Sequence, residues 1–148
     1  MIVEGFYVDS SALRHLYAHD RRSGAMAGWR FKNPGALPIT RFCRAEIINS
    51  MASAVFRGDI GEAAFQAFLA AFQQDLREDE LRLVDVPWRA VLDKATELSE
   101  RYTVKLGTRS LDVLHVASAM ELNARYFLTY DARQAKLAAM CGLKIVQP

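Results

Sequence analysis

The chain has 148 residues, of which 51% are apolar and 24% charged, and its formal net charge is only +2. This composition is that of an ordinary globular protein, and the length suits one domain spanning residues 1–148. No stretch approaches the roughly 20 uncharged apolar residues of a membrane span. The first residues do not combine a basic segment with an apolar one, as a secretory signal does. We therefore expect a cytoplasmic protein with no membrane segment.

The first half of the chain predicts helices separated by short strands and a long loop. Apolar residues at Ala45, Ile48 and Ala52 follow helical spacing, and Gly58 and Gly61 mark the turn after that helix. In chain order we expect a strand at 5–9, a helix at 11–19, a loop at 20–38 with a helix near 25–31, a strand at 37–39 and helices at 41–56 and 62–76.

The second half alternates strands and helices. Pro87 suits the first turn of a helix, where its missing N–H costs nothing. In chain order we expect a strand at 81–84, helices at 87–102 and 110–123, a strand at 126–130, a helix at 132–140 and a strand at 143–146. This alternation indicates an α/β fold with a mainly parallel sheet that helices cover on both faces.

Four acidic residues are the best candidates for a functional site. Asp9 and Asp131 each end an apolar run that we expect to be a strand. Asp112 lies in an otherwise apolar helical segment, and Glu46 lies early in the helix that starts at residue 41. Carboxylates at the ends of parallel strands face the crevice where α/β folds bind ligands. Such a set of oxygen ligands suits Mg²⁺ or Mn²⁺.

Each of these acids also has a structural explanation. Asp131 is a possible N-cap, with Gln134 completing a capping box, and Asp9 is a possible cap of the first helix. Asp112 is an acid in a first helical turn, where the helix dipole favours it, and Glu46 suits a solvated helix face. These explanations are weaker when the four acids are considered together. An unpaired carboxylate in so apolar a segment is costly, and four facing acids repel one another. A divalent ion removes both difficulties.

Other polar and sulfur-containing residues are candidates for supporting or structural roles. Ser11 and Thr129 each lie two residues from a candidate aspartate and are predicted to support the site through a hydrogen bond to a carboxylate or to water. His115 is interpreted as structural, because no further His or Cys lies at zinc-ligand spacing. Cys43 and Cys141 are interpreted as free thiols, since they form no metal-binding pattern. The signatures of dinucleotide sites, P-loops and hydrolase elbows are missing from the sequence.

With these residues placed, the chain resembles the PIN-domain ribonucleases, and within them the VapC-like toxins of toxin–antitoxin pairs. The likeness covers essentially the whole chain and depends on the order and spacing of four segments. These segments are YVDSSAL from residue 7, RAEI from residue 44, LDVLHVASA from residue 111 and FLTYD from residue 127.

The resemblance implies a single three-layer α/β/α PIN-like domain that cleaves RNA phosphodiester bonds with Mg²⁺ or Mn²⁺. Asp9 and Asp112 correspond to metal ligands of the family, and Glu46 and Asp131 complete its acidic pocket. It also implies a homodimer that a small cognate antitoxin protein neutralises. An arginine or lysine of that antitoxin, inserted among the four acids, is the expected means of inhibition, and the guanidinium of arginine pairs especially well with carboxylates.

Other functions remain open at this stage. A PIN-domain protein can process or bind RNA without being a toxin, or can cleave it only weakly. A strand-end aspartate also occurs in haloacid-dehalogenase-like phosphatases, but these require a second Asp two residues later, where this chain has Ser11. A phosphoacceptor domain requires an acidic pair near the first strand and a late Lys, and neither is found in the sequence.

Overall fold

The structure is a computed structural model that describes residues 5–148. The expectation about a secretory signal concerns Met1–Glu4, which lie outside the described residues. Contacts divide the chain into two compact units, the first made of residues 10–84 with Pro148 and the second of residues 5–9 and 85–147. The single domain expected over residues 1–148 stays a prediction. Within residues 5–148, no helix is long and apolar enough to cross a lipid bilayer.

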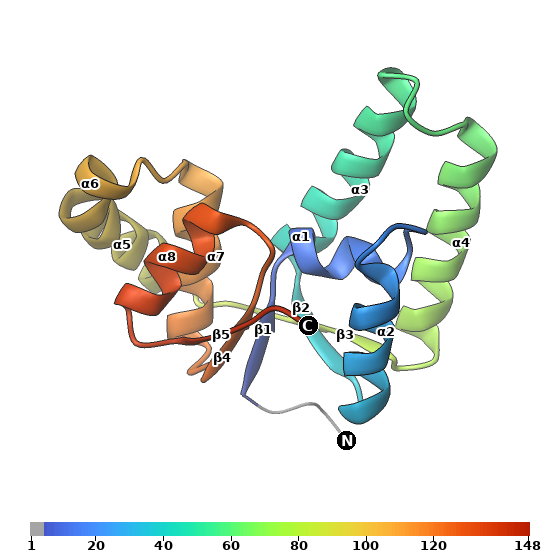
Figure 1. The fold of residues 1–148 in the computed structure, drawn as a ribbon. Helices are drawn as coiled ribbons and strands as arrows, with labels where there is room; N and C mark the ends of the chain where they lie inside the picture. Colours follow the sequence, from blue (N-terminus) through green and yellow to red (C-terminus); the bar gives the residue numbers. More distant parts are fainter. Residues whose placement is uncertain (1–4) are drawn as a thin grey trace. The chain divides into compact units, whose positions relative to one another are not determined.

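The first unit combines helices with one pair of parallel strands (Figure 1). Strand β2 pairs with β3, and Leu37 lies opposite Leu81. In chain order its elements are α1 (Ser10–Leu13), the 3-10 helix η1 (Arg14–Leu16), α2 (Ser23–Lys32), β2 (Leu37–Thr40), α3 (Arg41–Phe56), α4 (Glu62–Arg77) and β3 (Leu81–Val84).

Local sequence explains where the helices of this unit begin and which side they bury. The Thr40 side chain accepts a hydrogen bond of 2.9 Å from the backbone N–H of Cys43, which caps the start of α3. Helix α4 buries Phe68 and Phe72, which lie one turn apart, and the ring of Tyr17 packs 5.4 Å and 5.5 Å from their centroids. Helices α3 and α4 pack against each other as a hairpin (Figure 1).

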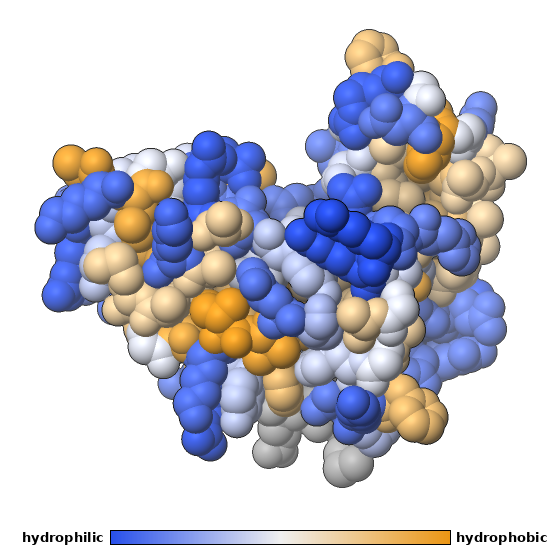
Figure 2. Space-filling model, viewed as in Figure 1, coloured by the Kyte–Doolittle hydropathy of each residue, from blue (hydrophilic) through white to orange (hydrophobic). Residues whose placement is uncertain are grey.

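The second unit contains a parallel three-stranded sheet in the order β1-β4-β5. Strand β4 lies in the middle, and Tyr7 pairs with Phe127 across β1 and β4. Figure 2 shows apolar side chains gathered along the path that β5 follows in Figure 1. The elements are β1 (Phe6–Val8), α5 (Trp88–Leu98), the π-helical turn η2 (Ser99–Thr103), α6 (Val104–Leu106), α7 (Ser110–Glu121), β4 (Tyr126–Leu128), α8 (Ala132–Met140) and β5 (Lys144–Val146).

Helix α7 forms the centre of this unit's core. It packs against both α5 and α8, so it has buried residues on more than one side, whereas a surface helix has a single apolar stripe. The rings of Tyr7 and Phe127 stack 5.3 Å apart beneath it. The buried apolar residues of this core are Tyr7, Val91, Ala95, Leu98, Val113, Val116, Ala117, Ala119, Phe127, Leu137, Ala138 and Leu143.

The order of helices and strands agrees with the sequence prediction, and the α/β class with parallel strands is confirmed. Several helix ends differ from the expected residues, and two helices differ most. The helix expected at 11–19 ends at Leu16, and the Asp20 side chain accepts from the N–H groups of Arg22 and Ser23 in the turn before α2. The helix expected at 87–102 leaves α-helical geometry after Leu98 and continues as a π-helical turn.

Candidate functional site

Asp9 stands at the end of β1 and is fully buried. Its backbone N–H donates to the carbonyl oxygen of Leu128 at 3.1 Å, which extends the pairing of β1 with β4. Its Oδ2 accepts a hydrogen bond of 2.6 Å from the hydroxyl of Thr129, which is also buried. The hydrogen bond predicted for Thr129 is therefore present, and it fixes the orientation of a buried carboxylate.

Asp112 lies in the first turn of α7, and its side chain is only 1% exposed. Its Oδ2 accepts from the backbone N–H of Arg109 at 2.9 Å and from the guanidinium Nε of Arg109 at 3.0 Å. Its Oδ1 accepts from the side-chain amide of Gln134 at 3.2 Å. Burial alone would raise the pKa of the Asp112 carboxyl, but the hydrogen bonds and charge of Arg109 outweigh it, so the pKa lies below its usual value.

Asp131 follows β4 and is the N-cap of α8. Its Oδ1 accepts from the backbone N–H groups of Arg133 and Gln134 at 2.8 Å and 3.0 Å, as the structural interpretation of this residue predicted. The capping box with Gln134 was wrong. The N–H of Asp131 donates to the Thr129 hydroxyl at 2.9 Å, and the Gln134 side chain donates to Asp112. The free energy of a tertiary contact to a buried carboxylate outweighs a local cap here.

One arginine joins two of these aspartates. The Nη2 atom of Arg109 lies 3.1 Å from Oδ1 of Asp112 and 3.0 Å from Oδ2 of Asp131. With the two bonds of Thr129, this contact places Asp9, Asp131 and Asp112 in one hydrogen-bonded network. Their role as metal ligands or catalytic groups stays a prediction.

Glu46 belongs to the other unit and lies in the second turn of α3. It is half-buried, and its Oε1 accepts a hydrogen bond from the hydroxyl of Ser10. Sequence reasoning selected Ser11 as the supporting serine and did not consider Ser10, although the Asp-Ser-Ser run offers both. The supporting role of Ser11 stays a prediction, and Ser10 is a residue that the sequence analysis missed.

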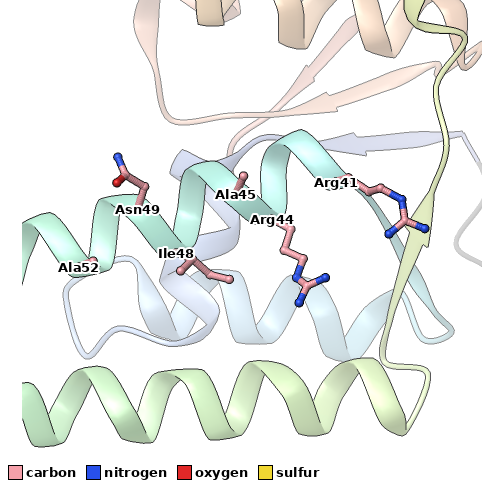
Figure 3. A pocket seen from close by; sticks show the side chains of 6 residues that line it. All are labelled: Arg41, Arg44, Ala45, Ile48, Asn49 and Ala52. Atoms are coloured by element: carbon pink, nitrogen blue, oxygen red, sulfur yellow. The ribbon is translucent and has the colours of Figure 1, made fainter.

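The exposed side of α3 carries a hollow of about 490 Å³. Figure 3 shows Arg41 and Arg44 extending from the first two turns of the helix, with Ile48 one turn beyond Arg44. The remaining lining residues are Ala45, Asn49 and Ala52. The hollow is therefore lined by two arginines together with the apolar side chains of Ala45, Ile48 and Ala52.

His115 and the two cysteines agree with their structural interpretations. The Nδ1 atom of His115 lies 2.8 Å from the hydroxyl of Tyr7, and the ring is fully buried. Cys43 is a buried free thiol, and Cys141 is a half-buried one. Burial raises the pKa of the Cys141 thiol, which makes it less reactive near neutral pH.

The donor set of the aspartate network fits a divalent ion by its chemistry. Carboxylate oxygens are the ligands that Mg²⁺ prefers, and oxygens of Asp112 and Asp131 already approach one cationic atom of Arg109. The arrangement of the side chains is a different matter. Among residues 5–148, no three His, Cys, Asp or Glu side chains are placed so that they could hold a metal ion. The Nη2 atom of Arg109 occupies the position between Asp112 and Asp131, so a metal ion can bind there only after the arginine side chain has moved.

Comparison with known proteins identifies the family. The PIN domain model matches residues 6–140, and the chain belongs to the PIN domain family. The fold is similar to VapC20 of Mycobacterium tuberculosis, a toxin that cleaves the sarcin–ricin loop. The TM-score is 0.69, the identity is 18%, and 97% of this chain and 99% of that chain are covered.

Two further solved structures share the fold. One is VapBC2 of Rickettsia felis bound to a DNA fragment from its promoter, with a TM-score of 0.66, 16% identity and coverage of 99% and 98%. The other is FitAcB of Neisseria gonorrhoeae, with a TM-score of 0.66, 12% identity and coverage of 95% of each chain. Comparison with curated proteins yields no match. At these identities the likeness establishes the PIN fold of this chain.

Proposed function

We propose that this protein is a divalent-metal-dependent endoribonuclease that acts at Asp9, Asp112 and Asp131, with Glu46 as a fourth acid. The observation that carries the proposal is the network in which Thr129 and Arg109 join the three aspartates. Two of these acids are almost completely buried. Carboxylates are rarely buried in this way unless they pair with donors or a cation.

The protein's own residues would hold the reacting groups in place. A bound Mg²⁺ or Mn²⁺ would activate water for attack on phosphorus and neutralise the developing charge. Thr129 orients Asp9, Gln134 orients Asp112, and the first turn of α8 orients Asp131. Carboxylates that are fixed before the substrate arrives do not need to reorganise during the reaction.

The arginines of α3 are proposed to bind the RNA backbone. Arg41 and Arg44 line one hollow and come from the same helix as Glu46. Phosphate contacts of this kind position a nucleic acid without reading its sequence. These arginines would therefore contribute to RNA affinity, and the acids to the chemical step.

We also propose that the nuclease is the toxin of a toxin–antitoxin pair. Two proteins of similar fold, VapBC2 and FitAcB, bear names that pair two components. The bonds of Arg109 to Asp112 and Asp131 illustrate how a partner's inserted arginine would engage these acids. The homodimer that the family resemblance implies stays a prediction.

A cleavage assay tests the nuclease. Purified protein and labelled RNA are incubated with Mg²⁺, Mn²⁺, Ca²⁺ or EDTA, and Asp112→Asn serves as the inactive control. We expect cleavage with Mg²⁺ or Mn²⁺, none with EDTA and none with Ca²⁺, whose looser geometry activates water poorly. Cleavage that persists in EDTA would contradict the metal-dependent mechanism, and RNA binding without cleavage would favour a PIN domain that only binds RNA.

A growth assay tests the toxin separately. Induced alone in a bacterial host, the protein should slow growth, whereas Asp112→Asn should not. Co-expression of a small protein encoded beside it should restore growth. An active nuclease that leaves growth unaffected and binds no neighbouring product would refute the toxin while leaving the nuclease intact.

A further inference from the structure

The guanidinium of Arg109 forms three hydrogen bonds to the carboxylates of the proposed metal site. Arg109 is the N-cap residue of α7, and its guanidinium reaches both oxygens of Asp112 and one oxygen of Asp131. All three distances lie between 3.0 Å and 3.1 Å. Its side chain is 61% exposed, whereas that of Asp112 is 1% exposed. A largely exposed guanidinium is therefore paired with one buried carboxylate, Asp112, and one partly exposed carboxylate, Asp131.

The same oxygen atoms cannot hold this guanidinium and a metal ion together. A divalent ion needs direct contact with carboxylate oxygens at about 2.0–2.6 Å. The Nη2 atom of Arg109 stands between Asp112 and Asp131, within 3.1 Å of an oxygen of each. Two cations this close would also repel each other strongly, because the neighbouring Asp112 is shielded from water.

We propose that Arg109 and a divalent cation are alternative occupants of the Asp112–Asp131 pair. Arg109 acts as a latch that neutralises the acids in the metal-free protein and swings out when metal binds. The inference rests on the proposed function, because the competing cation is the metal of the proposed nuclease. Arg109 thereby sets the metal affinity, although it is neither a metal ligand nor a group that activates water.

The surroundings allow the latch to open without losing the site. Asp131 keeps its bonds from the first turn of α8, and Asp112 keeps the side chain of Gln134 and the backbone N–H of Arg109. Both carboxylates therefore stay oriented when the guanidinium leaves. The released side chain of Arg109 then lies beside the site as a cation suited to the phosphates of RNA.

Metal binding to purified protein provides the test. Mn²⁺ affinity is measured by calorimetry for wild type and for Arg109→Gln, with Asp112→Asn defining binding at this site. A latch that must open reduces the apparent affinity by the fraction of open molecules, so Arg109→Gln should bind Mn²⁺ about tenfold more tightly. Arg109→Lys should fall between the two, since an ammonium cannot bridge the carboxylates as a guanidinium does.

Arg133→Gln is the matched control. It removes the same charge from α8, beside Asp131, and retains the backbone N–H that caps that residue. A general effect of net charge would change the Mn²⁺ affinity of both variants equally and would overturn the latch. An Arg109→Gln affinity equal to that of wild type, or weaker, would also overturn it.

Thermal unfolding adds a readout that does not depend on cleavage. In EDTA, Arg109→Gln should melt several degrees below wild type, because its acids have lost their cation. In saturating Mn²⁺ the difference should disappear, and a difference of unchanged size would contradict the proposal. Equal affinities with Asp112-dependent binding would refute the latch alone. If no variant shows Asp112-dependent Mn²⁺ binding, the metal-dependent function fails together with the latch.

Discussion

Two helices carry a candidate catalytic acid, and the protein holds the two acids in different ways. Asp112 on α7 is almost completely buried and accepts bonds from Arg109 and Gln134. Glu46 on α3 is half-buried and accepts a bond from Ser10. The difference follows from the helices. Seven residues of α7 are buried, Asp112 among them, whereas α3 buries a single stripe of Cys43, Ile47, Met51 and Ala54.

This contrast explains how much each acid depends on its neighbours. A carboxylate inside an apolar helix must receive protein donors, because water cannot reach it and desolvation is costly. A carboxylate on a half-exposed face can use water for its remaining bonds. Substitution at Asp112 should therefore disturb folding as well as chemistry, and substitution at Glu46 should disturb chemistry much more than folding.

The largest expected effect is on RNA cleavage. Asp112→Asn and Asp9→Asn should each reduce the rate by at least about 100-fold, the scale seen when one group that stabilises transition-state charge is removed. Glu46→Gln and Asp131→Asn should be impaired but can retain part of the rate if they act through water. Asp131→Asn should still cap α8, since Asn caps helices as well as Asp does.

Cleavage rates are compared at equal concentrations of folded protein. Asp93→Asn on the exposed side of α5 is the matched control and should cleave like wild type. Near-wild-type cleavage by Asp112→Asn would refute the site, and equal losses at Asp112 and Glu46 would remove the distinction between the two helices.

The next effect concerns RNA affinity and the exposed side of α3. The double variant Arg41→Gln/Arg44→Gln should bind single-stranded RNA more weakly. The slope of log affinity against log salt should fall by about 0.7 for each phosphate that the variant no longer neutralises. Arg57→Gln is the control, because Arg57 pairs with Asp59 at the far end of α3 at 2.9 Å. A salt slope equal to that of wild type would show that these arginines do not bind the RNA backbone.

A smaller effect separates the two acids by stability. Asp112→Asn in metal-free buffer should lose about 1–3 kcal/mol of unfolding free energy, because the buried amide of Gln134 and the guanidinium of Arg109 lose their charged acceptor. Glu46→Gln should lose less than about 1 kcal/mol, since its carboxylate is partly solvated. Urea unfolding monitored by circular dichroism measures both values. A larger loss at Glu46 would reverse the comparison.

The smallest effect probes the core beneath α7. Tyr7→Phe removes the hydroxyl that meets Nδ1 of the buried His115, and we expect a loss of about 1 kcal/mol with cleavage per folded molecule unchanged. Tyr126→Phe, on the half-buried start of β4, should change stability by less than about 0.5 kcal/mol. A loss of cleavage in folded Tyr7→Phe would assign His115 a role beyond packing.

The local sequence pattern predicted which helices and strands carry the acidic residues. The bounds of α3 were predicted correctly from helical spacing and from the turn at Gly58 and Gly61. The aspartates after β1 and β4 were found because each closes an apolar run. Arg109 was missed, although its position three residues before Asp112 is a pairing distance within a helix start.

The amino-acid sequence by itself determined the order of elements, the α/β class and the positions of the four acids, because these depend on periodicity and on neighbours along the chain. The tertiary structure alone decided which donors hold each carboxylate. Thr129 meets Asp9 across 120 positions, and Gln134 meets Asp112 across 22. Such partners are chosen by where β4 and α8 pack, since a buried charge accepts the donors that the folded chain brings to it.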